Sequence, residues 1–228
     1  IYGIASLSLA RAVVDARDRF GLPVVGFDLA GAEAGHPAHD HVEAYLYCHH
    51  HFLKKTVHAG EAYGPESIFE AVTRLNADRI GHGTHLYGVD QVEDDDPHRY
   101  VRQLSEYLAD RRILIEACIT SNMQTMPELR RVQDHPVGRM VQDRLSVTLC
   151  TDNRLVSSTT VSREYRLAVD AFGLTPAELR NMILHGFKRS FFPGSYKEKR
   201  AYVRKVIDYY DRTASTHGVP VVQRGSLG

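Results

Sequence analysis

Residues 56–61, Thr56-Val57-His58-Ala59-Gly60-Glu61, and residues 79–83, Arg79-Ile80-Gly81-His82-Gly83, have the same form. Each begins as a short apolar strand and ends in a turn of small residues that carries a histidine. Between them, after Gly64-Pro65, apolar residues recur at the spacing of one face of an amphipathic helix. The stretch therefore predicts a unit of strand, helix and strand.

Such a crossover makes its two strands parallel and brings their carboxyl ends to the same edge of a sheet. His58, Glu61 and His82 are therefore expected at that edge, which carries the chemistry in open α/β sheets and in (β/α)8 barrels alike. A histidine beside glycine is often only a turn residue. Two on successive parallel strands, with a glutamate three residues after the first, favour a functional site.

Five predicted strands alternate with helical patterns, as in βα units of one parallel sheet. The strands are 24–29, the two that begin at Thr56 and Arg79, 113–118 and 145–150. Besides the helix after Pro65, the helical patterns cover residues 4–20, 42–52, 100–111, 135–141, 161–172, 175–192 and 195–213.

Polar or glycine-rich turns follow every predicted strand. They carry Gly31, His58 with Glu61, His82, Ser121 with Asn122, and Asp152 with Asn153. A doubly wound sheet usually concentrates its ligand contacts at one switch point, whereas functional residues after every strand favour a barrel. The expected fold class is α/β, a (β/α)8 TIM-type barrel of which about five of the eight βα units are present.

Composition places the chain among soluble domains. It has 228 residues, 43% of them apolar, with 28 basic and 28 acidic residues, and residues 1–228 are expected to form a single domain. The zero formal charge argues against a nucleic-acid partner, and no apolar run approaches the ~18 residues needed to span a membrane. Three isolated cysteines suggest no disulfide framework, which favours a cytoplasmic protein.

The residue types at the strand ends suit metal-assisted hydrolysis. His58, His82 and Asp152 offer ligands that Zn²⁺ accepts, and Glu61 could move protons. The chain lacks G-x-S-x-G, a Walker loop, H-E-x-x-H and P-C-x-x-C, so the common templates for other hydrolases and deaminases do not apply.

Four motifs together resemble the adenosine deaminases of the zinc-dependent amidohydrolase superfamily. They are residues 56–61, residues 79–83, Thr120-Ser121-Asn122-Met123-Gln124-Thr125 and Thr151-Asp152-Asn153. The resemblance extends from Val24 to about Pro193. It implies a (β/α)8 barrel that converts adenosine or 2'-deoxyadenosine to inosine or 2'-deoxyinosine and ammonia, through a zinc-bound hydroxide that attacks purine C6.

The resemblance also implies a role for each matching residue. His58 would bind one Zn²⁺ through its imidazole, and Asp152 would be a carboxylate ligand that also holds the attacking hydroxide. His82 would orient the water and help to deprotonate it rather than bind the metal. Glu61 would protonate ring N1, and the backbone of Gly31 would donate to N3.

Asn153 differs from the aspartate that holds purine N7 in many family members. Because N7 only accepts hydrogen bonds, the amide NH₂ of asparagine can serve it at every pH. The surrounding residues 151–160 look like a bacterial branch of the family that carries asparagine at this position.

Family members begin their barrel with a strand that ends in H-x-H and supplies two further zinc ligands. The first three βα units of the family precede the point that matches Ile1, so the resemblance implies an N-terminally truncated chain that is inactive alone. A natural remnant that has lost activity is the alternative.

Other functions remain open at this stage. Deaminases of adenine or another 6-aminopurine share the same motifs. A non-catalytic purine- or metal-binding protein is a candidate from a different class, and a phosphoesterase of the same superfamily is a weaker one, since it would not need Glu61. The expected partner is a small purine nucleoside, and the sequence does not indicate an oligomeric state.

Overall fold

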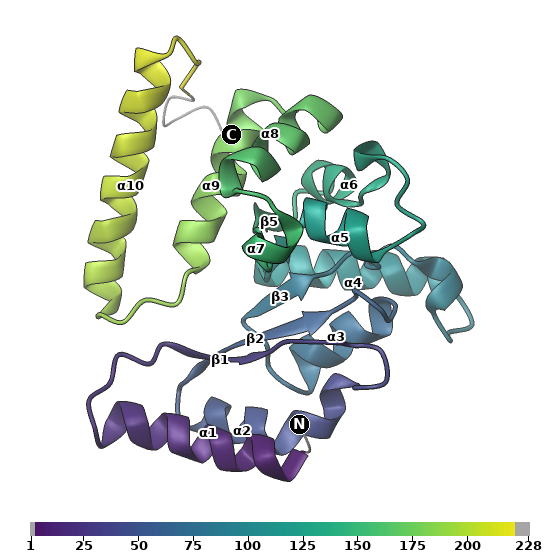
Figure 1. Cartoon of the computed structure of the whole chain (residues 1–228), viewed down its shortest axis with the longest axis vertical. Coiled ribbons are helices and arrows are strands. Elements are labelled where there is room, and N and C mark those ends of the chain that lie inside the picture. The colour runs from purple at the N-terminus through teal and green to yellow at the C-terminus, as the bar shows by residue number, and fades with distance from the viewer. Residues whose placement is uncertain (1–2, 222–228) are drawn as a thin grey trace.

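A computed structural model describes residues 3–221 and shows five short strands in the middle of the molecule with helices around them (Figure 1). The strands are β1 (Gly26–Leu29), β2 (Lys54–Ala59), β3 (Arg79–His82), β4 (Leu114–Ala117) and β5 (Ser146–Leu149). They pair in chain order and every pair is parallel. The predicted α/β fold with five βα units of a barrel is confirmed.

Helices connect the strands and continue after the last one. They are α1 (Gly3–Asp18), α2 (Val42–His50), α3 (Pro65–Thr73), α4 (Pro97–Arg111), α5 (Ile119–Thr125), α6 (Val137–Gln142), α7 (Arg154–Ser157), α8 (Val161–Phe172), α9 (Pro176–Arg189) and α10 (Tyr196–Thr216). The crossover α3 begins with proline at its first turn and buries Ile68, Ala71 and Val72, as the apolar spacing predicts.

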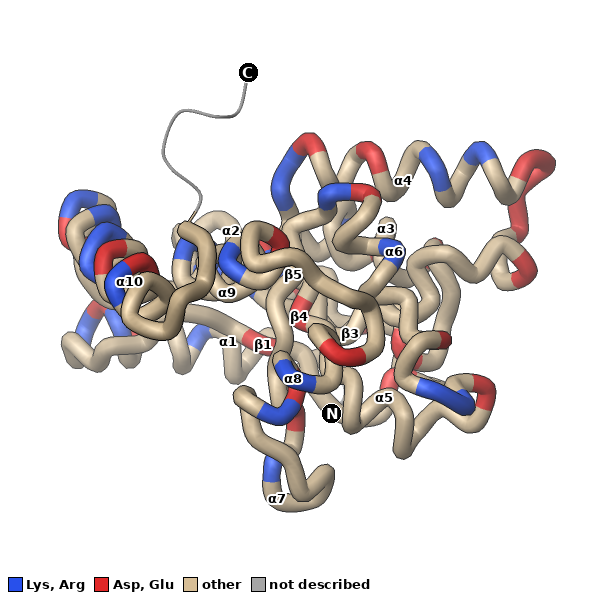
Figure 2. The backbone as a smooth tube through the Cα atoms, turned by 90° about the horizontal axis from the view of Figure 1, so that it is seen from above, with Lys and Arg blue, Asp and Glu red and all other residues tan. Residues whose placement is uncertain are grey.

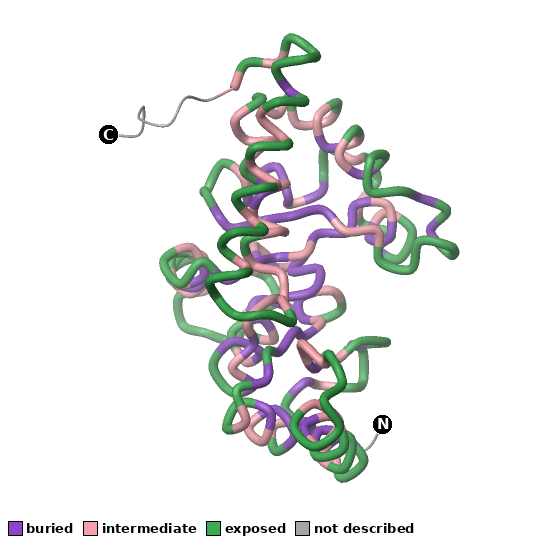
Figure 3. The backbone as a smooth tube through the Cα atoms, turned by 90° about the vertical axis from the view of Figure 1, so that its left-hand side faces the viewer, coloured by how far each residue is buried: buried purple, intermediate pink, exposed green. Residues whose placement is uncertain are grey.

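The two faces of the sheet differ in polarity. One register row consists of Val57, Ile80, Ile115 and Val147, all fully buried in the hydrophobic core. In Figure 3 the buried stretches of the chain gather in the middle of the molecule and the exposed stretches lie mainly around them. The next row is His58, Gly81, Glu116 and Thr148, and because side chains alternate along a strand, this row belongs to the opposite, polar face.

Helices close the molecule on both sides of the sheet. α1 packs on α2 near β1, α9 packs on β5, and α10 packs on α9 (Figure 1). A bidentate pair between Arg180 and Asp211 joins the last two helices, with distances of 2.8 and 3.0 Å. Among residues 3–221, none of the helices has the length and apolar character needed to cross a lipid bilayer.

Candidate active site

The backbone at the end of β3 brings two predicted site residues together. Register pairs His58 with Gly81, so strict alternation would place the side chains of His58 and His82 on opposite faces. His82 instead has a left-handed backbone with φ of 66°, which breaks the alternation. Its ring lies edge-on to the ring of His58, with 4.6 Å between the centroids.

Glycines at the strand ends make room for this arrangement. A Cβ atom at Gly81 would lie 2.9 Å from Cδ2 of His58, so any larger residue would displace that ring. The two motif turns are also bonded to each other, since the N–H of Gly83 donates to the carbonyl of Ala59 over 3.0 Å. The small residues of both motifs therefore serve close packing of the turns.

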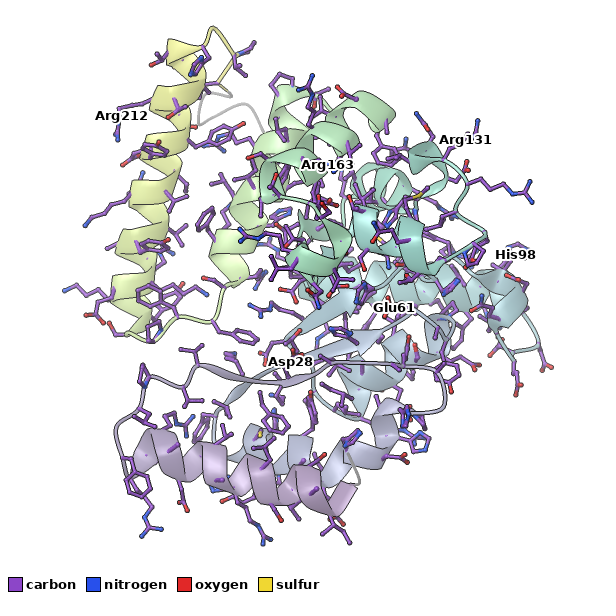
Figure 4. All side chains as sticks on the ribbon, viewed as in Figure 1. Asp28, Glu61, His98, Arg131, Arg163 and Arg212 are labelled. Carbon is purple, nitrogen blue, oxygen red and sulfur yellow. The ribbon has the colours of Figure 1, made fainter. Side chains whose placement is uncertain are left out.

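Glu61 lies near the centre of the molecule, beside the central strands (Figure 4). Its Oε2 is 3.6 Å from Nε2 of His82, and its side chain is only 20% exposed. Burial raises the pKa of Glu61, and the carboxylates of Asp152 and Glu33 raise it further, while His58 opposes them. The carboxyl group is thereby shifted toward its protonated form.

Glu33 holds the loop that carries Glu61, a role that sequence reasoning missed. Its buried carboxylate accepts N–H groups from Gly60, Glu61 and Ala62 at 3.0, 2.8 and 2.6 Å. The available signal was a carboxylate two residues after Gly31 at the same sheet edge.

His82 is held from its other side by buried polar groups. Nδ2 of Asn122 lies 3.2 Å from Nδ1 of His82, and Oδ1 of Asn122 lies 3.3 Å from Nε2 of His135. Burial lowers the pKa of His82, against the opposing effects of Asp152, Glu33 and the Asn122 hydrogen bond. His135 was not among the predicted site residues, because it belongs to the segment before α6 rather than to a strand end.

Asp152 follows β5 at the same edge and also has a left-handed backbone, with φ of 52°. Ser121 Oγ donates to its Oδ2 over 2.6 Å. Ser121 and Asn122 lie in helix α5 rather than in the predicted turn, so this bond ties α5 to the turn after β5. Asn153 is exposed and caps α7, where its Oδ1 accepts the N–H of Val156 over 3.4 Å. The side-chain oxygen of Asn153 is therefore engaged locally.

Three side chains form a compact group of possible metal ligands. His58, Glu61 and His82 each bring a ligand atom, and within residues 3–221 these atoms all lie within 4.8 Å of one another. Asp152 is outside this group, so the ligand pair expected from the resemblance, His58 and Asp152, differs from the set that the geometry gathers. Nδ1 of His58 is buried and lacks a hydrogen-bond partner among the described residues.

A cavity of about 250 Å³ lies beside these groups and is lined by Gly31, Glu33 and His58, among others. The predicted purine contact at Gly31 thus shares a cavity with the predicted ligand His58. A larger cavity of about 720 Å³ is lined at Arg112, Ser146 and Lys188, toward the start of β5. That cavity contains none of the predicted site residues, so its size does not identify it as the reaction site.

Sequence comparison supplies independent evidence about relatives. The family model described as "Adenosine deaminase" matches residues 4–209. The adenosine deaminase of Mycobacterium avium (strain 104) is 39% identical over 209 residues, which are 90% of this chain and 56% of that relative. The chain therefore spans about half the length of the curated relatives that it matches.

Solved structures show the same fold. The structure of Arabidopsis ADAL complexed with IMP has a TM-score of 0.73 and 25% identity, covering 96% of this chain and 57% of that one. An amidohydrolase from Burkholderia ambifaria with bound Zn has a TM-score of 0.72 and 23% identity, covering 92% of this chain and 56% of that one.

Proposed function

The chain belongs to the adenosine deaminase family, and from this membership we propose that the protein containing it hydrolyses adenosine or 2'-deoxyadenosine to inosine or 2'-deoxyinosine and ammonia. Residues 1–228 would form one domain, the C-terminal part of a deaminase barrel. The observation that carries the proposal is the placement of Glu61, a half-buried carboxyl beside His58 and His82 at the ends of two parallel strands.

Glu61 would act as the acid of the reaction. Its raised pKa favours the protonated carboxyl, which can donate a proton to purine N1. Protonation of N1 disrupts the aromatic ring and makes C6 more electrophilic, so that water can add there and the amino group can leave as ammonia. Glu33 supports this role because it fixes the backbone on both sides of Glu61.

His58 and Asp152 would hold a zinc ion. The donor types fit zinc, and the buried Nδ1 of His58 without a partner among residues 3–221 fits a polar group that lacks its ligand. When bound, zinc lowers the pKa of a coordinated water to about 7. Ser121 would orient the Asp152 carboxylate through their 2.6 Å hydrogen bond, and His82 would hold the attacking water.

The purine would lie in the cavity beside β1 and β2 that Gly31, Glu33 and His58 line. The backbone N–H of Gly31 would donate to N3, and the NH₂ group of Asn153 would donate to N7. Gly31 supports this because it lines the same cavity as His58 and a side chain there would be strained, with φ of 110°. Asn153 supports it because its Oδ1 already accepts a bond, so the amide is oriented by α7.

Another 6-aminopurine is the second candidate substrate. Arabidopsis ADAL, which shares the fold at 25% identity, has been solved with the nucleotide IMP. Adenine, a modified adenosine or a purine nucleotide would use the same acid and the same contacts to the ring. Only the group attached to the purine would differ.

The test is ammonia release with added Zn²⁺, measured for this chain and for the longer form encoded by the reading frame upstream of Ile1. Adenosine, 2'-deoxyadenosine, adenine and AMP are compared as substrates. We expect activity in the longer form, with little or none in the chain alone, since the family takes two further zinc ligands from another strand.

Glu61→Gln should reduce the rate of the longer form by about 10²–10⁴-fold, because glutamine cannot transfer the proton. Glu106→Gln, a change of the same chemistry on the exposed side of α4, is the matched control. If only adenine or only AMP releases ammonia, that compound replaces adenosine as the proposed substrate. If no substrate releases ammonia, the deaminase assignment is wrong and a non-catalytic protein is favoured.

A further inference from the structure

A chain of buried hydrogen bonds runs from the start of α6 to His82. The N–H of Val137 donates to Nδ1 of His135 over 3.2 Å. His135 Nε2 then meets Asn122 Oδ1 at 3.3 Å, and Asn122 Nδ2 meets His82 Nδ1 at 3.2 Å. The three side chains are 0–2% exposed, so water does not offer them alternative partners.

The backbone N–H of Val137 sets the donor and the acceptor of each hydrogen bond in this series. It can only donate, so Nδ1 of His135 must accept, and the proton of a neutral His135 is then on Nε2. Burial lowers the pKa of His135 to about 4, so its ring is neutral at pH 7. Nε2–H of His135 therefore donates to the oxygen of Asn122.

Asn122 passes this direction on to His82. With its oxygen accepting from His135, its NH₂ group faces Nδ1 of His82 and donates to it. Turning the amide over would place its NH₂ group against the Nε2–H of His135, so two donors would face each other. A proton on Nδ1 of His82 would create the same conflict on the other side.

We propose that His135 and Asn122 are positioning residues that fix the tautomer of His82, with the ring proton on Nε2. That nitrogen lies 3.6 Å from Oε2 of Glu61, on the side of the candidate reaction site. The catalytic meaning of this tautomer rests on the proposed deaminase function, whereas the tautomer itself follows from the hydrogen bonds.

The tautomer changes the part that His82 can take in the reaction. A nitrogen that already carries its proton donates a hydrogen bond and cannot accept a proton from water. His82 therefore orients the attacking oxygen. When the oxygen–C6 bond forms, the proton of the water passes to the carboxylate of Asp152, or to Glu61 once Glu61 has given its own proton to N1. This differs from the expectation that His82 helps to deprotonate the water, and it also disfavours Nε2 of His82 as a metal ligand.

The experiment is NMR of the ¹⁵N-labelled chain of residues 1–228 at pH 7, using the two-bond correlations between ring nitrogens and ring protons. These correlations show which nitrogen of each histidine carries the proton. The signals of His82 are identified by their loss in His82→Gln. We expect the wild-type chain to show His82 protonated at Nε2.

Two variants test whether Asn122 and His135 fix the tautomer of His82. Asn122→Asp replaces the donor with a carboxylate that only accepts, so the proton of His82 should move to Nδ1. His135→Gln keeps an NH₂ group that can donate to Asn122, so His82 should stay protonated at Nε2. Asn181→Asp, the same change at an exposed position of α9, should leave the His82 signals unchanged.

A wild-type His82 protonated at Nδ1 overturns the proposal, as does an Asn122→Asp chain whose His82 stays protonated at Nε2. If Asn122→Asp fails to fold, the wild-type tautomer and its retention in His135→Gln still decide the question. The readout does not depend on turnover. A protein that releases no ammonia but shows the Nε2 tautomer would remove the deaminase function and leave this inference standing.

Discussion

His82 has a backbone conformation that costs a residue with a side chain about 1–2 kcal/mol, and Asp152 has one of the same kind. His82 ends β3, and Asp152 lies three residues after the end of β5 at the same candidate reaction edge. Such conformations persist only where the surrounding structure enforces them, and they concentrate at functional sites. At His82 the enforcing contacts are the hydrogen bond from Asn122 and the contact with the His58 ring.

Glu33 is not one of the residues proposed to react, and its carboxylate holds the loop that carries Glu61. The two oxygens of the Glu33 carboxylate accept the N–H groups of Gly60, Glu61 and Ala62. Glu33→Gln leaves only one oxygen, the amide carbonyl, to accept these hydrogen bonds. We expect the chain to lose about 1.5–3 kcal/mol of unfolding free energy, because charge-assisted bonds are lost and buried donors are left unpaired. Urea unfolding measures this loss.

Hydrogen exchange should locate the effect of Glu33→Gln in residues 60–62. Glu106→Gln, at an exposed position of α4, controls for the loss of one negative charge and should change the free energy by less than about 0.5 kcal/mol. Equal losses in the two variants would show that Glu33 does not hold the loop.

The sequence predicts correctly those site residues whose position follows from the order and direction of the strands. Parallel strands place His58, Glu61 and His82 at one edge, and the structure brings all three together. Sequence reasoning did not reach Glu33 or His135, because their roles depend on how loops pack in space. It also could not show that His82 departs from strand alternation, since a positive φ in a non-glycine residue has no pattern in the sequence.

Elements with strong periodicity were predicted well. All five strands are confirmed, and α8 covers the predicted residues 161–172. Helix α4 begins at Pro97, three residues before the predicted start, because Asp96 accepts the N–H of Arg99 and proline fits the first turn. Helices α5 and α7 were missed because they are short and begin inside polar turns.

The docking of α10 depends on its pairing with α9. The guanidinium of Arg180 and the carboxylate of Asp211 form two parallel bonds, and both side chains are largely buried. Asp211→Asn should cost about 1 kcal/mol and speed hydrogen exchange in α10 more than in β2 or β3. Asp208→Asn removes the same charge from an exposed position of the same helix. If both variants exchange alike, the pair does not hold α10.

At the scale of the whole molecule, stability should fall as the pH drops below neutrality. His135 has a pKa of about 4 in the folded chain, against about 6.5 when unfolded, so the unfolded chain binds the additional proton. The contribution of His135 to the free energy of unfolding is complete above pH 6.5. It is lost as the pH falls toward 4, and the loss is about 3 kcal/mol at pH 4.

A comparison of variants isolates this effect of pH, because Glu61 and Glu116 have raised pKa values and act in the opposite direction. Urea unfolding between pH 4 and 7 measures the proton difference in the wild type and in His135→Gln. Unfolding of His135→Gln should take up about one proton fewer than unfolding of the wild type in this pH range. An unchanged pH slope in His135→Gln would show that His135 is not the group that titrates.

The larger cavity near the start of β5 brings many positive charges together. Its basic lining residues are Arg112, Arg144, Lys188, Arg189, Lys199, Arg200 and Arg204, and within residues 3–221 no Asp or Glu lines it. Basic residues recur along α10, which forms one wall (Figure 2). Burial lowers the pKa of Lys188, and Arg180, Arg112 and Arg189 lower it further, as expected where like charges are crowded.

Mutual repulsion in this cavity should make salt stabilise the chain. Raising NaCl from about 0.02 to about 0.5 M shortens the screening length severalfold, and we expect about 1 kcal/mol, or about 2–4 °C in melting temperature. Arg204→Gln, which removes one lining charge, should stabilise the chain at low salt and reduce its response to salt. Arg212→Gln removes an exposed charge of α10 outside the cavity and should do neither. A melting temperature that falls with salt would mean that favourable ion pairs outweigh the repulsion around this cavity.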